Sequence, residues 1–244
     1  MNPIEQFKQE TSKRIQSYAD DVELKTLANT WVEKSMQKKY VYNFSWLGRP
    51  IIQYPEDIMA LQEIIWQVKP DLIIETGIAH GGSLIFSASM LHLLCGDGEV
   101  VGIDIDIREH NRKEIEVHPL SQRITMIEGS SISSEMEEKV RQICQNKKNI
   151  MVILDSNHTH DHVMKELEIY SKFVSKDSYL IVLDTFVEDM PPGFFEDRPW
   201  DVGNNPKTAV WEFIKSNTSF KIDTSIHHKL LITVAPDGYL KRVK

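Results

Sequence analysis

The chain lacks the marks of several protein classes. Its 244 residues include only two cysteines, which offer no disulfide framework, and we expect Cys95 and Cys144 to be buried, reduced thiols of a cytoplasmic protein. No apolar run approaches the ~20 residues of a membrane span, and the polar N-terminus does not resemble a secretory signal. Basic residues are in the minority, giving a formal net charge of −8. Because nucleic-acid surfaces normally have a basic footprint, the composition favours a small-molecule partner.

Strand and helix patterns alternate regularly from about residue 55 onward. Two late strand-like runs, 220–226 and 229–234, are joined only by His227 and His228, which predicts an antiparallel hairpin. Together the runs predict an α/β protein with a Rossmann-like, seven-stranded, mainly parallel sheet. The five earlier strands are near-continuous apolar runs typical of strands covered on both faces, at 71–76, 99–104, 123–129, 149–155 and 179–185.

The expected domain organisation is a helical N-terminal segment followed by one main domain. Residues 1–50 carry two helical patterns, and we expect them to form a cap or a subunit contact in a homo-oligomer. Residues 51–244 form the main domain. Within it, Ser134 is predicted to begin a helix through a capping box and Asn205 to cap the last predicted helix. A loop as long as 186–204 is usually functional.

The most informative stretch is the turn at 71–83, where an apolar strand leads to an acid, a glycine-rich turn and an apolar helix. Gly77 suits a tight turn, and Gly81 and Gly82 remove side chains where a ligand must approach. The pattern E-x-G-x-x-x-G-G-S differs from the G-x-G-x-x-G of dinucleotide folds. Glu75 would repel a diphosphate but suits an ammonium group, as in S-adenosylmethionine. The alternative interpretation is an ordinary turn whose glycines serve packing.

Acids end four of the predicted strands. In open α/β sheets, ligands bind at the carboxyl ends of the strands, so these acids should line one cleft. Asp104 would accept hydrogen bonds from ribose hydroxyls of the cofactor. Asp155 and Asp184, on neighbouring strands, would chelate a hard cation such as Mg²⁺. Single strand-end acids are often only helix caps or solvated loop residues, but four in sequence are harder to explain in that way.

His158 lies three residues after Asp155, beside the predicted cation. With an ordinary pKa of ~6.5, histidine is a natural general base for a hydroxyl, although an N-cap or loop role is the alternative. Metal coordination would help to ionise the alcohol, and its oxygen would then attack a sulfonium methyl group. His160 and His162 are interpreted as a helix-start and a solvent-facing residue, because alternate residues of a helix face different ways.

These motifs together resemble the cephalosporin hydroxylase family, whose members are class I S-adenosylmethionine-dependent O-methyltransferases of sugars and antibiotics. The resemblance spans most of the chain, and it rests on residues 46–55, 74–83, 102–104, 128–131, 155–158 and 184–185. It implies a cofactor site whose methionine part contacts Glu75, Gly77, Gly81, Gly82 and Ser83, whose ribose contacts Asp104, and whose adenine side contacts Gly129 and Ser130, with Asp155 nearby.

The metal site departs from the pattern of the related macrolide-sugar methyltransferases. These bind Mg²⁺ through the acid of D-x-x-H and an acidic pair at the end of the next strand. Residues 155–158 match D-x-x-H and Asp184 matches the second acid of the pair, but Leu183 stands at the first. With one ligand missing, either Glu188 or Asp189 substitutes, or metal affinity is weak, or the enzyme works without metal.

The sequence therefore predicts an S-adenosylmethionine-dependent O-methyltransferase with His158 and Asp155 as catalytic residues and Mg²⁺ at Asp155 and Asp184. Its acceptor would be a hydroxyl of a sugar, in a polysaccharide or glycan, or of a secondary-metabolite scaffold. A nicotinamide-dependent oxidoreductase is one alternative, disfavoured by the glycine spacing and the terminal hairpin. The other is a non-catalytic scaffold that binds the cofactor, an alternative that Leu183 leaves open.

Overall fold

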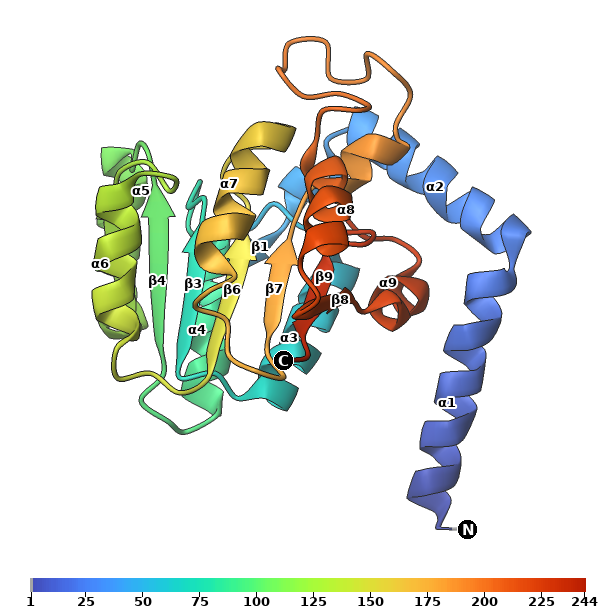
Figure 1. Cartoon of the computed structure of the whole chain (residues 1–244), viewed down its shortest axis with the longest axis horizontal. Helices are drawn as coiled ribbons and strands as arrows, with labels where there is room; N and C mark the ends of the chain where they lie inside the picture. Colours follow the sequence, from blue (N-terminus) through green and yellow to red (C-terminus); the bar gives the residue numbers. More distant parts are fainter. Residues whose placement is uncertain (1) are drawn as a thin grey trace.

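The structure, a computed structural model, describes residues 2–244 and is built on one seven-stranded sheet. The strand order is β5-β4-β3-β6-β7-β9-β8, with β9 antiparallel to both of its neighbours and the other pairs parallel (Figure 1). The predicted fold class is therefore confirmed. The strands are β3 (Leu72–Thr76), β4 (Glu99–Asp104), β5 (Ile124–Glu128), β6 (Ile150–Leu154), β7 (Tyr179–Val182), β8 (Phe220–Ile222) and β9 (Tyr239–Arg242).

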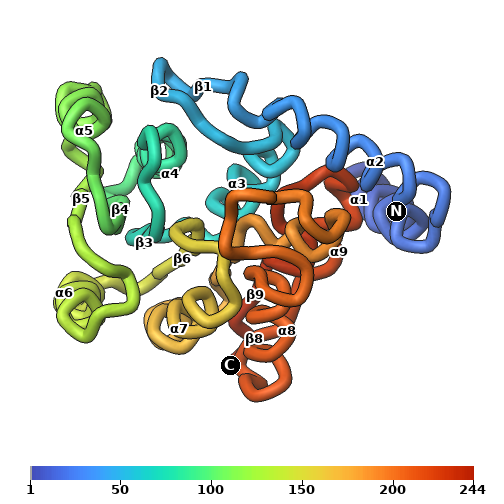
Figure 2. Tube along the Cα trace, turned by 90° about the horizontal axis from the view of Figure 1, so that it is seen from above, coloured from blue at the N-terminus to red at the C-terminus, as the bar shows by residue number. Residues whose placement is uncertain are grey.

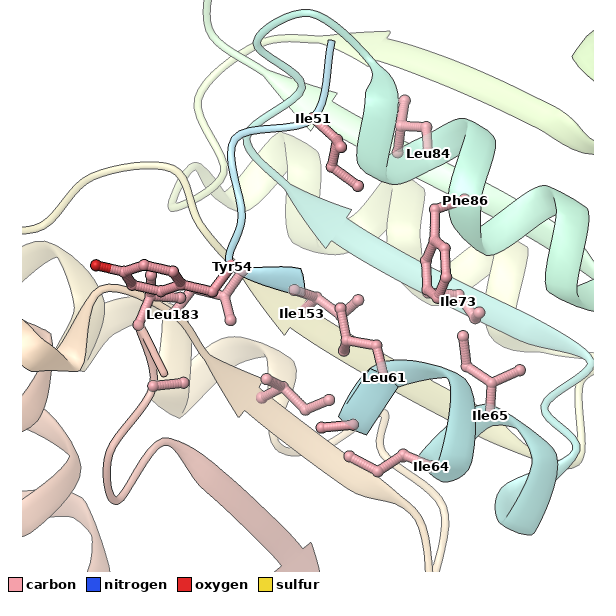
Figure 3. Close-up of a cluster of buried hydrophobic side chains, with 14 of the residues drawn as sticks. Ile51, Tyr54, Leu61, Ile64, Ile65, Ile73, Leu84, Phe86, Ile153 and Leu183 are labelled. Carbon is pink, nitrogen blue, oxygen red and sulfur yellow. The ribbon is translucent and has the colours of Figure 1, made fainter. Parts of the chain in front are cut away.

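Helices cover both faces of this sheet, as Figure 2 shows from above. One face carries α3 (Pro55–Val68), α4 (Gly82–Leu93) and α5 (Glu109–Glu116), and the other carries α6 (Ser134–Cys144), α7 (His160–Tyr170) and α8 (Pro206–Ser216). Along β3, Ile73 belongs to the apolar cluster under α3 and α4, whereas Leu72 and Ile74 belong to the opposite one (Figure 3). Both faces are buried, which explains the unbroken apolar runs.

The N-terminal segment contains both predicted helices, α1 (Pro3–Asp20) and α2 (Val22–Gln37). Helix α1 buries none of its residues, extends away from the sheet and contacts α9 (Thr224–Leu230) (Figure 1). A short 3₁₀ turn (Tyr40–Asn43) follows, and the hairpin of β1 (Ser45–Trp46) and β2 (Arg49–Pro50) then leads to the main sheet. The division at residue 50 stays a prediction. No helix among residues 2–244 has the length and apolar character needed to cross a membrane.

The predicted bounds of the final hairpin are wrong. Strands β8 and β9 do pair antiparallel, but α9 and a loop connect them, not a two-residue turn. Ile226 and Leu230, four residues apart, pack together toward the core, which is a helical spacing. Val234 N donates to the Asp57 carboxylate at 2.9 Å, and within residues 2–244 the run 229–234 forms no strand. The apolar residues of this run therefore belong to a helix and a loop, not to a strand.

Other local predictions need smaller corrections. Cys95 is exposed, because α4 ends at Leu93 and the chain turns away in a left-handed conformation (φ 58°) at the cysteine. Cys144, the last residue of α6, is half-buried. The cap of α6 is Ser133, one residue before the predicted Ser134, and its side chain accepts from Met136 N at 3.2 Å. The predicted cap at Asn205 is confirmed, as a capping box with Thr208.

Candidate active site

The glycines of the turn after β3 allow close packing within the protein. Gly77 has a φ of +91°, and a Cβ there would lie 2.1 Å from the Asp155 carbonyl oxygen. A Cβ at Gly82 would lie 2.1 Å from the Pro50 carbonyl oxygen, and one at Gly81 would collide with Ile115 at 2.3 Å. The space at these positions is filled by the chain itself. Packing is thus a sufficient reason for the three glycines, and their contact with a cofactor stays a prediction.

Glu75 lies at the end of β3 and is 1% exposed. Ser83 Oγ donates to Glu75 Oε1, but Oε2 is buried without a hydrogen-bond partner among residues 2–244. Burial raises the pKa of Glu75 to about 7, and the hydrogen bond from Ser83 acts in the opposite direction. Buried polar groups are normally paired. This carboxylate therefore offers an acceptor to a ligand that brings a donor or a positive charge.

Asp104, at the end of β4, holds the neighbouring turns together. Its Oδ2 accepts from Ile78 N at 2.8 Å and its Oδ1 from Asp106 N at 3.1 Å. The Asp104 carbonyl oxygen accepts from Gly129 N at 2.8 Å, and Ser130 follows in a turn whose carbonyl accepts from the α6 cap. The predicted ribose and adenine residues are therefore adjacent at one rim, built from the loops after β4 and β5.

Asp155, His158 and Asp184 form a compact cluster at the ends of β6 and β7. Each offers one potential ligand atom, and these atoms lie within 4.8 Å of one another. His158 Nδ1 is 3.4 Å from Asp184 Oδ2. Desolvation, followed by the charges of Asp184 and Glu75, raises the pKa of Asp155 well above its ordinary value. Desolvation also raises the pKa of Asp184, against the effect of His158. Two carboxylates that share a site in this way suit a cation.

The other predicted candidates lie outside this cluster. His160 begins α7 as expected, and its Nδ1 is 2.8 Å from Thr208 Oγ1. His162 is not solvent-facing: its Nε2 lies 3.2 Å from the hydroxyl oxygens of both Ser131 and Ser156. Neither histidine joins Asp155 and Asp184, because α7 directs both rings to other neighbours.

The two proposed substitutes for the missing acidic ligand are engaged elsewhere. Glu188 Oε2 accepts from Gly203 N at 2.8 Å, and Asp189 is paired through both oxygens with Lys207 Nζ at 2.7 Å. Leu183 itself is 3% exposed in the apolar cluster under α3 (Figure 3). Substitution by Glu188 or Asp189 is therefore wrong in this structure, and among residues 2–244 the acids of the cluster are Asp155 and Asp184.

Two residues next to the cluster could not be identified as its neighbours from the sequence. Trp200, on the loop at 186–204, packs edge-on against His158 with ring centroids 4.6 Å apart. Glu166 is fully buried and accepts from Ser156 Oγ at 2.7 Å, while its Oε2 has no partner in the described part of the chain. Its spacing four residues after His162 on α7 was the only local signal.

The strand order and the acids at the carboxyl edge define the class I methyltransferase fold. Solved structures of that class agree. CmcI with Mg and SAM aligns with a TM-score of 0.59 at 17% identity, covering 83% of this chain and 78% of that one. An O-methyltransferase from Bacillus cereus in complex with SAH aligns with a TM-score of 0.53 at 15% identity, covering 94% and 96%.

The chain belongs to the rhamnosyl O-methyltransferase/CmcI family, whose model matches residues 38–243. Rhamnosyl O-methyltransferase of Mycobacterium bovis is 26% identical over 223 residues, covering 86% of this chain and 85% of the relative. That of Mycobacterium leprae is 25% identical over 220 residues, covering 86% and 90%. The predicted enzyme class, an S-adenosylmethionine-dependent O-methyltransferase, is confirmed, and the oxidoreductase and scaffold alternatives are set aside.

Proposed function

We propose that this enzyme methylates a hydroxyl of a sugar, with a rhamnosyl unit as the first acceptor to test. The enzyme class sets the reaction, and the names of the mycobacterial relatives supply the candidate acceptor. The observation that supports the chemistry is the convergence of Asp155, His158 and Asp184 at the edge of the sheet where Glu75 also ends its strand.

The donor half of the site is assigned to the ends of β3, β4 and β5. The unpaired Oε2 of Glu75 suits the ammonium of the methionine part, held near Gly77, Gly81, Gly82 and Ser83. Asp104 keeps acceptor capacity beyond its two backbone bonds, because each ionised carboxylate oxygen can accept more than one hydrogen bond. We assign it to the ribose hydroxyls, and the loop at Gly129 and Ser130 to the adenine side.

The acceptor half is assigned to the ends of β6 and β7. Asp155 and Asp184 would hold Mg²⁺, which commonly uses only one or two protein carboxylates and completes its shell with water and substrate. When bound there, the ion would lower the pKa of the acceptor hydroxyl. The raised pKa of Asp155 supports this assignment, because desolvation and then the charge of Asp184 raise it, and a cation would relieve that repulsion.

His158 is assigned as the general base. The carboxylate of Asp184 lies 3.4 Å from Nδ1, which favours a proton on Nδ1 and leaves the Nε2 lone pair free. Trp200 packs against the ring and limits its rotation. With S-adenosylmethionine bound, Nε2 would take the hydroxyl proton, and the cofactor would supply its methyl group to the sugar oxygen as the carbon–sulfur bond broke. S-adenosylhomocysteine and the methyl ether are the products.

Transfer of a labelled methyl group tests this proposal. We expect label from S-adenosylmethionine to appear on a rhamnosylated acceptor, EDTA to suppress the transfer and Mg²⁺ to restore it. Full activity after exhaustive chelation, with no metal by elemental analysis, would leave Asp155 as a cofactor or substrate contact. Binding of S-adenosylhomocysteine without transfer to any sugar acceptor would refute the substrate class and keep the enzyme class.

A further inference from the structure

Gln53 has a buried amide oxygen without a hydrogen-bond partner in the described part of the chain. Gln53 is 4% exposed, and its Oε1 is fully buried with no hydrogen-bond partner among residues 2–244. Native proteins pair nearly all buried polar side-chain atoms, with protein groups, water or ligands. An unpaired amide therefore marks a place where a bound group completes the structure, provided that the amide lies at a site.

The segment that carries Gln53 is fixed against the glycine turn. Arg49 donates to the His80 carbonyl oxygen, with distances of 3.0 and 2.7 Å from Nε and Nη2. The Pro50 carbonyl fills the space beside Gly82 at the start of α4. The first part of the segment thus lies on the turn whose strand ends with Glu75.

The other end of the segment is fixed beside the acceptor half. Tyr54 Oη lies 2.5 Å from Ser35 Oγ, and its ring belongs to the same buried cluster as Leu183. Figure 3 shows the chain running from Ile51 to Tyr54 past the tips of the strands that carry Ile73 and Ile153. Gln53 is therefore held at the carboxyl edge of the sheet, between the turn after β3 and the end of β7.

Glu75 faces the same layer as this segment. Side chains two residues apart on a strand share a face, and Ile73 packs in one cluster with Ile51 and Tyr54. The bond from Ser83 on α4 places the Glu75 carboxylate on that face as well. The Glu75 carboxylate thus lies on the face that this segment covers, at the strand edge where the backbone of Gln53 passes.

We propose that Gln53 binds the α-amino-acid group of the methyl donor together with Glu75. This inference rests on the proposed function. The amino-acid end carries an ammonium, which suits the Glu75 carboxylate and the unpaired Oε1 of Gln53, and a carboxylate, which suits the N–H donors of the same amide. Gln53 belongs to the donor half because Arg49 and Pro50 attach its segment to the turn at 77–82, not to the loop at 186–204.

Calorimetry with two ligands tests the assignment. S-adenosylhomocysteine carries the amino-acid group, whereas 5′-methylthioadenosine lacks it and keeps the nucleoside. We expect Gln53→Met, which replaces the amide by an apolar group of similar length, to weaken S-adenosylhomocysteine binding by about tenfold or more, and to leave 5′-methylthioadenosine binding unchanged. Gln53→Glu, which sets a carboxylate against that of the ligand, should weaken S-adenosylhomocysteine binding further.

Asp104→Asn is the matched control, because both ligands carry the ribose and should both bind less tightly to it. If Gln53→Met weakened the binding of both ligands equally, Gln53 would have a structural role. If it changed neither affinity, Gln53 would not contact the ligand. Either result overturns the inference. Failure of the wild-type protein to bind S-adenosylhomocysteine would refute the proposed function instead. Thermal unfolding of each variant confirms that the comparison uses folded protein.

Discussion

Two buried carboxylates in different regions show what distinguishes a site from a scaffold. Asp57, in the first turn of α3, and Glu75, at the end of β3, are 0% and 1% exposed, and burial raises the pKa of each to about 7. Asp57 is satisfied by Thr233 Oγ1, Tyr239 Oη and Val234 N. Glu75 has one donor and an unpaired oxygen. Burial and a raised pKa therefore do not distinguish the two carboxylates, whereas the unpaired oxygen of Glu75 does.

The difference has a structural meaning. Asp57 joins the start of α3 to the loop before β9, more than 170 residues later, and so fastens the last strand to the body of the domain. Glu75 is built into an equally rigid strand but leaves part of its hydrogen-bonding capacity unused. If the comparison is right, changes near Glu75 should affect ligands and turnover, and changes at Asp57 should affect stability.

The largest expected effect is on turnover in the site region. A general base typically contributes ~10²–10⁴ in rate, so His158→Ala should lower turnover by that order and leave S-adenosylhomocysteine affinity and the melting temperature nearly unchanged. Steady-state kinetics and calorimetry measure the two effects. His160→Ala, two residues along and paired with Thr208, is the control and should change turnover little. Near-normal turnover of His158→Ala would assign the base elsewhere.

In the scaffold region, Asp57→Ala should lower the free energy of unfolding by about 2–4 kcal/mol. The substitution leaves the donors of Thr233, Val234 and Tyr239 without their acceptor, and each buried unsatisfied group is costly. Urea unfolding measures the loss. Affinity for S-adenosylhomocysteine, measured where the variant is fully folded, should match the wild type. A selective loss of ligand affinity without loss of stability would break the comparison.

At Glu75 we expect a loss of ligand affinity without a loss of stability. Glu75→Gln keeps the shape and removes the charge, so S-adenosylhomocysteine affinity should fall by about 1.5–3 kcal/mol, the value of hydrogen bonds to charged groups. Stability at pH 8 should stay equal or increase, because an ionised and incompletely paired buried carboxylate is unfavourable. Calorimetry and urea unfolding on one preparation measure both. Unchanged affinity would remove Glu75 from the donor site.

The remaining effect is the pH dependence of stability, which is small over any single pH unit. The pKa of Asp57 rises from 3.8 to about 7 on folding, through desolvation and against its three hydrogen bonds. Between these values the folded state keeps a proton that the unfolded state has released, so stability falls as pH rises through this range. One group contributes at most about 1.4 kcal/mol per pH unit.

Asp57→Asn cannot titrate and should therefore show a flatter dependence than the wild type in urea unfolding at pH 5, 6 and 7. Some slope remains, because Glu75 titrates in the same sense. If the free energy of unfolding depended on pH in the same way for wild type and variant, Asp57 would have the same pKa in the folded and unfolded states. That result would contradict its role as a buried group that joins α3 to the loop before β9.

Local sequence alone determined the parallel strands, the acids at their ends and the Asn205 cap, and the resemblance of motifs along the chain to a known family implied the enzyme class. Strands buried on both faces must be apolar throughout, and a helix start must satisfy its free N–H groups locally, so both leave patterns in neighbouring residues. The same reasoning misplaced the final hairpin, where Ile226 and Val234 fit an alternation but serve a helix and an Asp57 contact.

Tertiary structure alone decided which polar atoms are paired. Asp57 and Glu75 look alike in sequence, but segments far along the chain supply three donors to Asp57, whereas Glu75 receives a single donor from Ser83 on the next helix. The unpaired amide oxygen of Gln53 and the packing of Trp200 on His158 could not be predicted from the sequence either. Periodicity reports which face of an element is buried, whereas the satisfaction of a buried polar group depends on atoms that the fold brings from elsewhere.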